Sequence, residues 1–253
     1  MPKGKVAIVT GGTSGIGYAI SDLFTQKGTT VVACSSRQDA VDETIQKLGC
    51  DGLAADLSQA SECKRLVDYT IEKYGHVDIL INNAGIQHVC PIEDFPEEKW
   101  SFMMNLMLNA PFLLTKYCWN SMKEQHWGRI INIGSIQGLV ASKFKSCYVT
   151  AKHGLNGLTM VSALEGGEYG ITVNSICPAY VDTPLVQKQI ASQAKVHNIN
   201  EEEVISNIML SNSAIKKLLD PMEIASFCRY LCSDQAGMIT GASIPIDGGW
   251  TAN

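Results

Sequence analysis

The sequence predicts an α/β fold built on a doubly wound parallel sheet. Short apolar runs alternate along the chain with longer segments of helical periodicity. Because the runs are almost continuously apolar, they are typical of parallel strands that helices cover on both faces. The first run leads directly into a glycine-rich turn and then a helix. We therefore expect a Rossmann-type sheet in a single domain that comprises residues 1–253.

The expected elements follow one another in βαβ order. The apolar runs predict strands at Val6–Thr10, Thr30–Cys34, Gly52–Ala55, Ile79–Asn82, Arg129–Ile133, Thr172–Ile176 and Ser243–Ile246. The segments between them predict helices at Gly17–Lys27, Ala40–Leu48, Ala60–Tyr74, Glu97–Met122, Tyr148–Glu165 and Pro221–Ser233. A polar insertion, residues 183–213, follows the sixth strand. An insertion of this length at the carboxyl edge of a sheet indicates either a small helical substrate lid or a peripheral helical pair.

Composition excludes several classes of function. The net charge of -5 argues against a nucleic-acid partner, and no apolar run reaches the length of a membrane span. The nine cysteines are irregularly spaced and contain no C-x-x-C pair, which favours a reducing, cytoplasmic setting. The five histidines show no metal-ligand spacing, so we expect no metal.

A tyrosine, a lysine and a serine form the most informative constellation. Tyr148 and Lys152 are four residues apart, so on a helix they share one face, and Ser135 lies thirteen residues upstream of the tyrosine. A nearby cation lowers the pKa of a phenol, which is ordinarily about 10. Tyr148 would then exchange a proton with a substrate hydroxyl while Ser135 holds its oxygen. Taken alone, the same spacing also fits a surface tyrosine beside a solvated lysine.

The glycine-rich turn after the first strand indicates a dinucleotide. Glycines let the backbone approach a pyrophosphate, and the following helix N-terminus supplies free N–H groups. The spacing is T-G-x-x-x-G-x-G. The candidate cofactor-binding residues of this turn are Gly11, Thr13, Ser14, Gly15, Ile16 and Gly17.

Together these motifs and Asn82-Asn83-Ala84-Gly85 resemble the short-chain dehydrogenases/reductases across nearly the whole chain. The resemblance implies a nicotinamide cofactor and hydride transfer at a carbinol carbon. It implies that Tyr148 is the acid/base, that Lys152 binds the nicotinamide ribose and lowers the pKa of the tyrosine, and that Ser135 contacts the substrate oxygen. It also implies frequent homotetramers, with contacts through the last helix, the last strand and the C-terminal tail. Further cofactor contacts carried over from the family are Asp56, Leu57, Asn83, Ala84, Gly85, Pro178, Val181 and Thr183.

The chain departs from the family at a fourth catalytic position. Where the family usually has an asparagine, five residues before an aromatic, this chain has Met107. The flanking Asn105 and Asn109 lie about 200° around a helix from that position. Pro111 lacks an N–H and cannot bond the carbonyl of Met107. We hypothesise that Pro111 opens the helix and keeps this carbonyl available for a proton relay; the alternative is a simple packing kink.

Five stretches carry a finer resemblance: Gly85–Val89, Gly138–Ser142, Thr150–Gly154, Val181–Val186 and Asp247–Ala252. They resemble the corresponding stretches of bacterial D-3-hydroxybutyrate dehydrogenases. That group holds a small carboxylate with glutamine, histidine, lysine and glutamine side chains. The resemblance carries these roles onto Gln87, Gln137, Lys145 and Gln189, with Gln137 replacing the histidine. A lysine and amides suit an anion, so we expect a short 3-hydroxy or 3-oxo acid or a sulfonate. Individually, Lys145 is equally compatible with a solvated loop charge and Gln189 with a helix surface.

The cofactor choice rests on the end of the second strand. An acid there usually selects NAD, but the sequence reads Cys34-Ser35-Ser36-Arg37. Ser36 and Arg37 suit the 2′-phosphate of NADP, whereas the hydroxybutyrate dehydrogenases resemble NAD enzymes. NAD is expected, with NADP the alternative. Rival functions are a 3-oxoacyl-thioester or steroid reductase of the same family, and a non-catalytic nucleotide-binding regulator.

Overall fold

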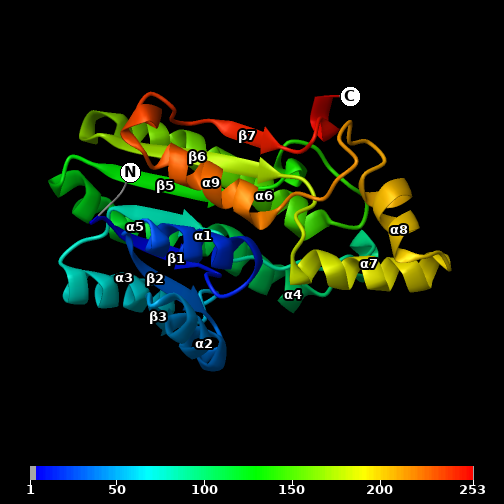
Figure 1. Ribbon diagram of the computed structural model, residues 1–253, viewed down its shortest axis with the longest axis horizontal. Coiled ribbons are helices and arrows are strands. Elements are labelled where there is room, and N and C mark those ends of the chain that lie inside the picture. The colour runs from blue at the N-terminus through cyan, green and yellow to red at the C-terminus, as the bar shows by residue number, and fades with distance from the viewer. Residues whose placement is uncertain (1–3, 253) are drawn as a thin grey trace.

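The computed structural model describes residues 4–252, apart from the side chains of residues 192, 193 and 195–197 (Figure 1). At its centre lies a parallel sheet of seven strands in the order β3-β2-β1-β4-β5-β6-β7. The strands are β1 (Val6–Thr10), β2 (Thr30–Ser35), β3 (Asp51–Ala54), β4 (Ile79–Asn82), β5 (Gly128–Ile133), β6 (Ile171–Pro178) and β7 (Ser243–Ile246). The strand order reverses between β1 and β4, and a ligand crevice is expected at the carboxyl ends of these two strands.

Helices cover both faces of the sheet. The described helices are α1 (Gly15–Gln26), α2 (Gln38–Leu48), α3 (Ala60–Tyr74), α4 (Glu97–Met104), α5 (Ala110–Glu124), α6 (Ser146–Gly166), α7 (Pro184–His197), α8 (Glu201–Glu203) and α9 (Pro221–Leu231). The predicted strands and helices are confirmed, with ends shifted by one or two residues. The exception is the predicted helix Glu97–Met122, which is divided by a π-helical turn at Asn105–Asn109.

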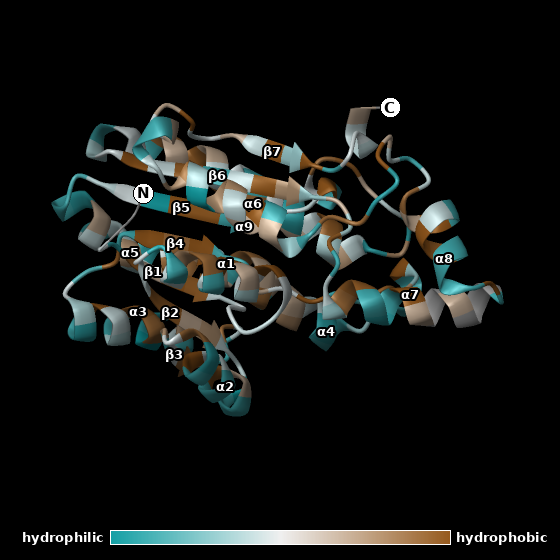
Figure 2. Ribbon diagram, in the orientation of Figure 1, coloured by the Kyte–Doolittle hydropathy of each residue, from teal (hydrophilic) through white to brown (hydrophobic). Residues whose placement is uncertain are grey.

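The two faces explain why the strands read as continuous apolar runs. Val9 and Ile81 point into a core formed with α1 and α9, whereas their neighbours Ile8 and Leu80 point into a core formed with α3 and α5. Figure 2 shows the hydrophobic residues concentrated on the central strands. All four of these side chains are fully buried. Burial of each contributes roughly 1.5–3 kcal/mol, so successive residues on one strand stabilise opposite layers.

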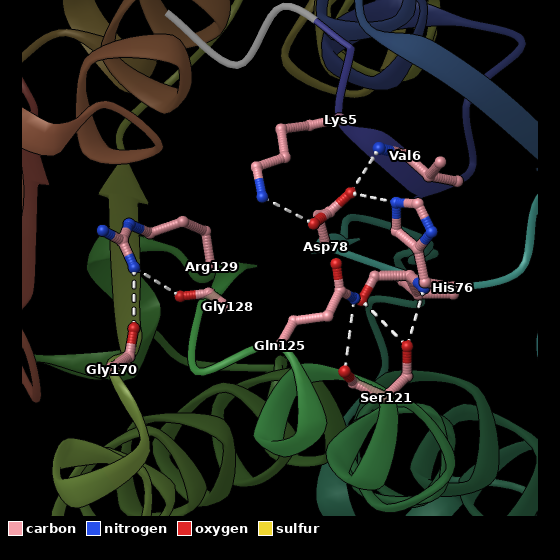
Figure 3. A network of polar contacts seen from close by, with 10 residues as sticks. Lys5, Val6, His76, Asp78, Ser121, Gln125, Gly128, Arg129 and Gly170 are labelled. Carbon is pink, nitrogen blue, oxygen red and sulfur yellow. Dashed lines mark hydrogen bonds and ion pairs between the residues drawn. The ribbon is translucent and has the colours of Figure 1, made fainter.

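A polar network ties the amino ends of the strands together, at the edge opposite the crevice (Figure 3). The buried Asp78 carboxylate accepts hydrogen bonds from the Val6 N–H at 2.8 Å and from Lys5 Nζ at 2.9 Å, and His76 Nε2 lies 3.0 Å away. Arg129 Nη1 donates to the carbonyl of Gly170, which precedes β6. The network therefore links β1, β4, β5 and β6 without touching the carboxyl edge.

The insertion after β6 forms two helices that project beyond the carboxyl edge of the sheet (Figure 1). Thr183 caps α7, and its side chain accepts a hydrogen bond from the Val186 N–H. Asn200 and Glu203 form a capping box that starts α8. A small apolar cluster that includes Val186, Ile190 and Val204 packs α7 against the π-helical turn Val204–Met209, which follows α8 directly.

Candidate active site

The glycine-rich turn forms a cradle with no room for a side chain at Gly11 or Gly17. Gly11 and Gly15 have left-handed φ values of 62° and 50°. A Cβ on Gly17 would lie 2.1 Å from the carbonyl oxygen of Gly11, and one on Gly11 would lie 2.8 Å from Asn83 Nδ2. The Ser14 hydroxyl makes no capping bond at the start of α1. The turn therefore presents a helix N-terminus and a bare backbone, which fit the pyrophosphate of a dinucleotide.

A cavity of about 220 Å³ opens beside this cradle at the switch point between β1 and β4. Residues far apart in the sequence meet on its walls. The predicted site residues that line it are Gly11, Ser14, Gly15, Ile16, Asn83, Ala84, Gly85, Ser135, Tyr148, Lys152, Pro178, Val181 and Thr183.

The remaining predicted cofactor residues lie outside the lining of this cavity. Gly17 is buried behind Gly11, and Leu57 is buried in the core. Thr13, Ser36, Arg37 and Asp56 lie away from the cavity walls, and the last three are exposed beyond β2 and β3. Their cofactor roles stay predictions.

Hydrogen bonds fix the wall of the cavity that follows β4. Asn83 Nδ2 donates to the carbonyls of Thr10 at 2.9 Å and Gly11 at 3.2 Å. The Thr10 hydroxyl accepts from the N–H groups of Asn83 and Ala84 at 2.9 and 3.0 Å. The segment after β4 and the phosphate cradle thus form one rigid unit.

Tyr148, Lys152 and Ser135 come together as predicted. Helix α6 presents both Tyr148 and Lys152 to the cavity that Ser135 also lines. Lys152 Nζ lies 5.6 Å from the Tyr148 ring centroid and donates a 2.6 Å hydrogen bond to the Ile133 carbonyl. The Ser135 hydroxyl accepts from the N–H of Gln137 at 3.1 Å. The surface-tyrosine alternative is therefore wrong.

Burial acts on the pKa of Tyr148 in the direction opposite to the effect expected of the lysine. Burial raises the pKa of Tyr148 above its usual value, and the neighbouring Ser135 hydroxyl acts in the opposite direction. Burial lowers the pKa of Lys152 to about 8. Both groups lose hydration in the same crevice, and the ammonium bonds a main-chain carbonyl instead of the phenol. Desolvation is the largest influence on both pKa values, and the lowering of the tyrosine pKa by Lys152 stays a prediction.

Met107 lies behind the tyrosine. Its side chain is buried in a cluster with Met103, Cys147 and Ala151, against which Tyr148 packs. Asn109 Nδ2 donates to Asn105 Oδ1 at 2.8 Å, so the flanking asparagines pair with each other and do not replace the missing one. The π-helical turn places a widened backbone directly before Pro111, as the hypothesis of an opened helix requires. The relay through the Met107 carbonyl stays a prediction.

A second, smaller cavity of about 80 Å³ adjoins the first and shares Ser135 and Tyr148 with it. All four predicted substrate residues line it: Gln87, Gln137, Lys145 and Gln189. Lys145 is half-buried at the start of α6, and burial lowers the pKa of its ammonium. Gln137 is 4% exposed, and among the described residues its Oε1 has no hydrogen-bond partner. Lys145 and Gln189 are both half-buried on the cavity wall, and their substrate roles stay predictions.

Sequence reasoning missed residues on the walls between the two cavities. Leu185 and Val186 of α7 line both. Tyr180 lines the smaller cavity, and Lys145 Nζ lies 5.8 Å from its ring centroid. The position of Tyr180 between Pro178 and Val181, two predicted cofactor contacts, was the available signal.

Comparison with known proteins agrees with this geometry. A family model described as short chain dehydrogenase matches residues 5–194. The chain belongs to the short-chain dehydrogenase family. It is 44% identical over 255 residues to a D-beta-hydroxybutyrate dehydrogenase of Rhizobium meliloti, covering 98% of this chain and 99% of that protein. Identity to the D-beta-hydroxybutyrate dehydrogenase of Cupriavidus necator is 41% over 258 residues, with full coverage of both.

A solved structure of actinorhodin polyketide ketoreductase with NADPH is similar throughout, with a TM-score of 0.93. It is 30% identical in sequence and covers 98% of each chain. As a short-chain dehydrogenase, the protein is an NAD(P)-dependent oxidoreductase that acts on hydroxyl or keto groups. Within residues 4–252, no helix is both long and apolar enough to cross a membrane.

Proposed function

We propose that the protein interconverts a short 3-hydroxy acid and its 3-oxo acid, with 3-hydroxybutyrate and acetoacetate as the expected pair and NAD as cofactor. One observation carries the proposal: a lysine and three glutamines converge on a small cavity directly beside Tyr148 and Ser135. These side chains come from four separate segments of the chain, so no local structural need explains their meeting.

The electrostatics of the small cavity favour an anionic substrate. The Lys145 ammonium is half-buried, and no carboxylate of the described residues pairs with it. A desolvated, unpaired charge is costly, and the lowered pKa of Lys145 reflects this cost. A substrate carboxylate would restore a partner, and glutamine amides donate to the same oxygens.

The neighbouring residues support proton transfer at the substrate carbinol. A bound nicotinamide supplies the hydride acceptor. Tyr148 removes the hydroxyl proton during oxidation and returns it during reduction, while Ser135 steadies the oxygen. Because burial raises the pKa of Tyr148, the phenol holds its proton at neutral pH and is ready to act as the acid.

The size of the cavity supports the proposal over its rivals. About 80 Å³ with a lysine on the wall suits a compact anion better than a steroid or a long acyl thioester. A regulator without catalysis would not need Ser135, Tyr148 and Lys152 assembled in one crevice.

Initial rates followed at 340 nm test the substrate. We expect turnover of 3-hydroxybutyrate that Tyr148→Phe abolishes, and a rise in KM for the acid in Lys145→Ala. Loss of a charged hydrogen bond costs about 1.5–3 kcal/mol, which corresponds to roughly 10- to 150-fold in kcat/KM. The exposed Lys143→Ala is the matched control. An unchanged KM in Lys145→Ala contradicts the carboxylate role.

We further propose that residues 183–213 act as a lid. Leu185 and Val186 separate the two cavities, and Gln189 of the same helix reaches the smaller one. The Thr183 side chain lies against Gly15, which connects the base of α7 to the phosphate cradle. Hydrogen exchange in α7 should slow when NAD and an acid bind together. An exchange rate in α7 that stays the same when both ligands bind contradicts the lid.

A homotetramer in a reducing cytoplasm completes the proposal. Helices α5 and α6 expose large apolar side chains: Phe112, Met160, Val161 and Leu164. Leu164 is 84% exposed, which supports self-association through these helices. All nine cysteines are free, as expected of a reducing compartment. Light scattering should give the mass of four chains, and Leu164→Glu should lower it.

A further inference from the structure

The arginine after β2 is already engaged by an acid. Arg37 Nη2 lies 3.1 Å from Asp39 Oδ2. Arg37 is the N-cap of α2, and Asp39 lies in its first turn. A carboxylate there interacts favourably with the arginine and with the positive end of the helix dipole. The Asp39 carboxylate thus offsets both features of this edge that attract a phosphate, the Arg37 guanidinium and the positive end of the α2 dipole.

A second arginine at the same edge is engaged in the same way. Arg65 of α3 donates to Glu62 through Nε at 3.0 Å and Nη2 at 2.6 Å, and its Nη2 also donates to the carbonyl of Ala54 at the end of β3. Ala54 pairs with Ser35, the last residue of β2, so this ion pair lies beside the end of that strand.

The charge at the ends of β2 and β3 is therefore not positive. Arg37 pairs with Asp39 and Arg65 with Glu62, and the Asp56 carboxylate acts on the pKa of Glu62. A phosphate monoester brings a further charge of about -1.5 to -2 at pH 7, and its recognition depends on a cation free to bond it. The uncharged 2′-hydroxyl of NAD needs only an acceptor, which a carboxylate provides.

We propose that Asp39 is the specificity-determining residue that makes this protein select NAD over NADP. A 2′-phosphate would have to compete with Asp39 for Arg37 and would lie beside the displaced carboxylate. The ion pair is largely exposed and weak by itself. Its influence comes from the repulsion between Asp39 and the doubly charged phosphate. This inference rests on the choice of NAD in the proposed function and does not depend on the proposed 3-hydroxy acid.

Titration calorimetry with NAD+ and NADP+, without substrate, tests the proposal. The wild-type protein should bind NAD+ at least about tenfold more tightly than NADP+, the size expected for repulsion between close charges. Asp39→Asn should tighten NADP+ binding by roughly five- to tenfold, and the double variant Asp39→Asn/Arg37→Gln should lose that gain. Asp42→Asn is the matched control, because Asp42 is exposed one turn further along α2 and pairs with Gln38.

Three results would overturn the proposal. They are equal affinity of the wild type for both nucleotides, a selectivity ratio that Asp39→Asn leaves unchanged, and an equal change in Asp42→Asn. A protein that selects NAD through Asp39 but does not turn over 3-hydroxybutyrate would contradict only the proposed substrate. The two failures are therefore distinguishable.

Discussion

The ammonium of Lys152 donates a 2.6 Å hydrogen bond to the carbonyl oxygen of Ile133, the last residue of β5. This bond joins the catalytic face of α6 to the carboxyl edge of the sheet. It keeps a nearly fully buried cation within 5.6 Å of the Tyr148 ring centroid, and no carboxylate of the described residues pairs with this cation. The site therefore holds a charge whose burial opposes folding.

Replacement of Lys152 by methionine should stabilise the protein and abolish catalysis. The pKa of Lys152 is lowered from 10.5 to about 8, so the unfolded chain binds more protons between these values and stability rises with pH there. Below about pH 8 the buried Lys152 is charged, and the full free-energy cost of burying its ammonium applies, at most about 3 kcal/mol. The gain in Lys152→Met, measured by urea unfolding, should be largest below pH 8 and vanish towards pH 10.5.

The exposed Lys143→Met is the matched control and should alter neither stability nor turnover. Destabilisation of Lys152→Met at pH 7 would show that the hydrogen bond to Ile133 outweighs the desolvation of the ammonium.

Ser135→Ala should move the pH profile of oxidation to higher pH. Burial raises the pKa of Tyr148, and the Ser135 hydroxyl is the neighbour that lowers it. Oxidation needs the phenolate, so its kcat/KM should rise with pH in the wild type and rise later in the variant. Loss of the oxygen contact should also lower kcat by roughly 10²–10³. If the pH profile of Ser135→Ala falls in height without moving along the pH axis, Ser135 has no influence on the pKa of Tyr148.

Pro111→Ala should lower turnover if the widened helix serves the proton relay. Alanine restores an N–H that can bond the Met107 carbonyl and close the π-helical turn. We expect a loss of roughly tenfold or more in kcat with little change in the affinity for NAD, because relays of this kind contribute to general acid–base catalysis. Unchanged turnover would leave Pro111 as a packing kink.

Phe144, the residue directly before Lys145, has a left-handed backbone conformation. Its φ is 66°, its ring is 54% exposed, and its carbonyl accepts a hydrogen bond from the Cys90 N–H at 2.9 Å. This conformation costs a bulky residue about 1–2 kcal/mol. Phe144→Asn should raise the unfolding free energy by up to about 1 kcal/mol and leave KM for the acid unchanged.

The β-branched variant Phe144→Val should resist the left-handed turn and raise KM through displacement of Lys145. Equal KM values in the asparagine and valine variants would show that the turn does not position the lysine.

Asp78→Asn should destabilise the fold without altering the site. The buried carboxylate accepts from Val6 and Lys5 at the edge opposite the crevice (Figure 3). Loss of a buried charged partner costs about 3–5 kcal/mol, which urea unfolding will measure. The exposed Asp68→Asn removes only a surface pair with Lys64 and should change stability by less than about 1 kcal/mol. Normal affinity for NAD in the folded variant confirms that the network is structural.

Local sequence patterns were sufficient to predict the sheet, the phosphate cradle and the shared helix face of Tyr148 and Lys152. Each of these depends on near neighbours. Continuous apolar runs require two covered faces, glycines permit the cradle, and a spacing of four residues aligns two side chains on a helix. The family motifs also indicated the four side chains of the small cavity.

The electrostatic behaviour of the site depends on how distant segments of the chain pack together. The rise in the pKa of Tyr148 comes from burial, which depends on every segment that packs around it. The half-burial of Lys145 and the pairing of Arg37 with Asp39 likewise depend on where chain segments come to rest. Hydration lost on burial is a property of the assembled surroundings, so residue spacing predicts which groups meet but not the charge they carry once they do.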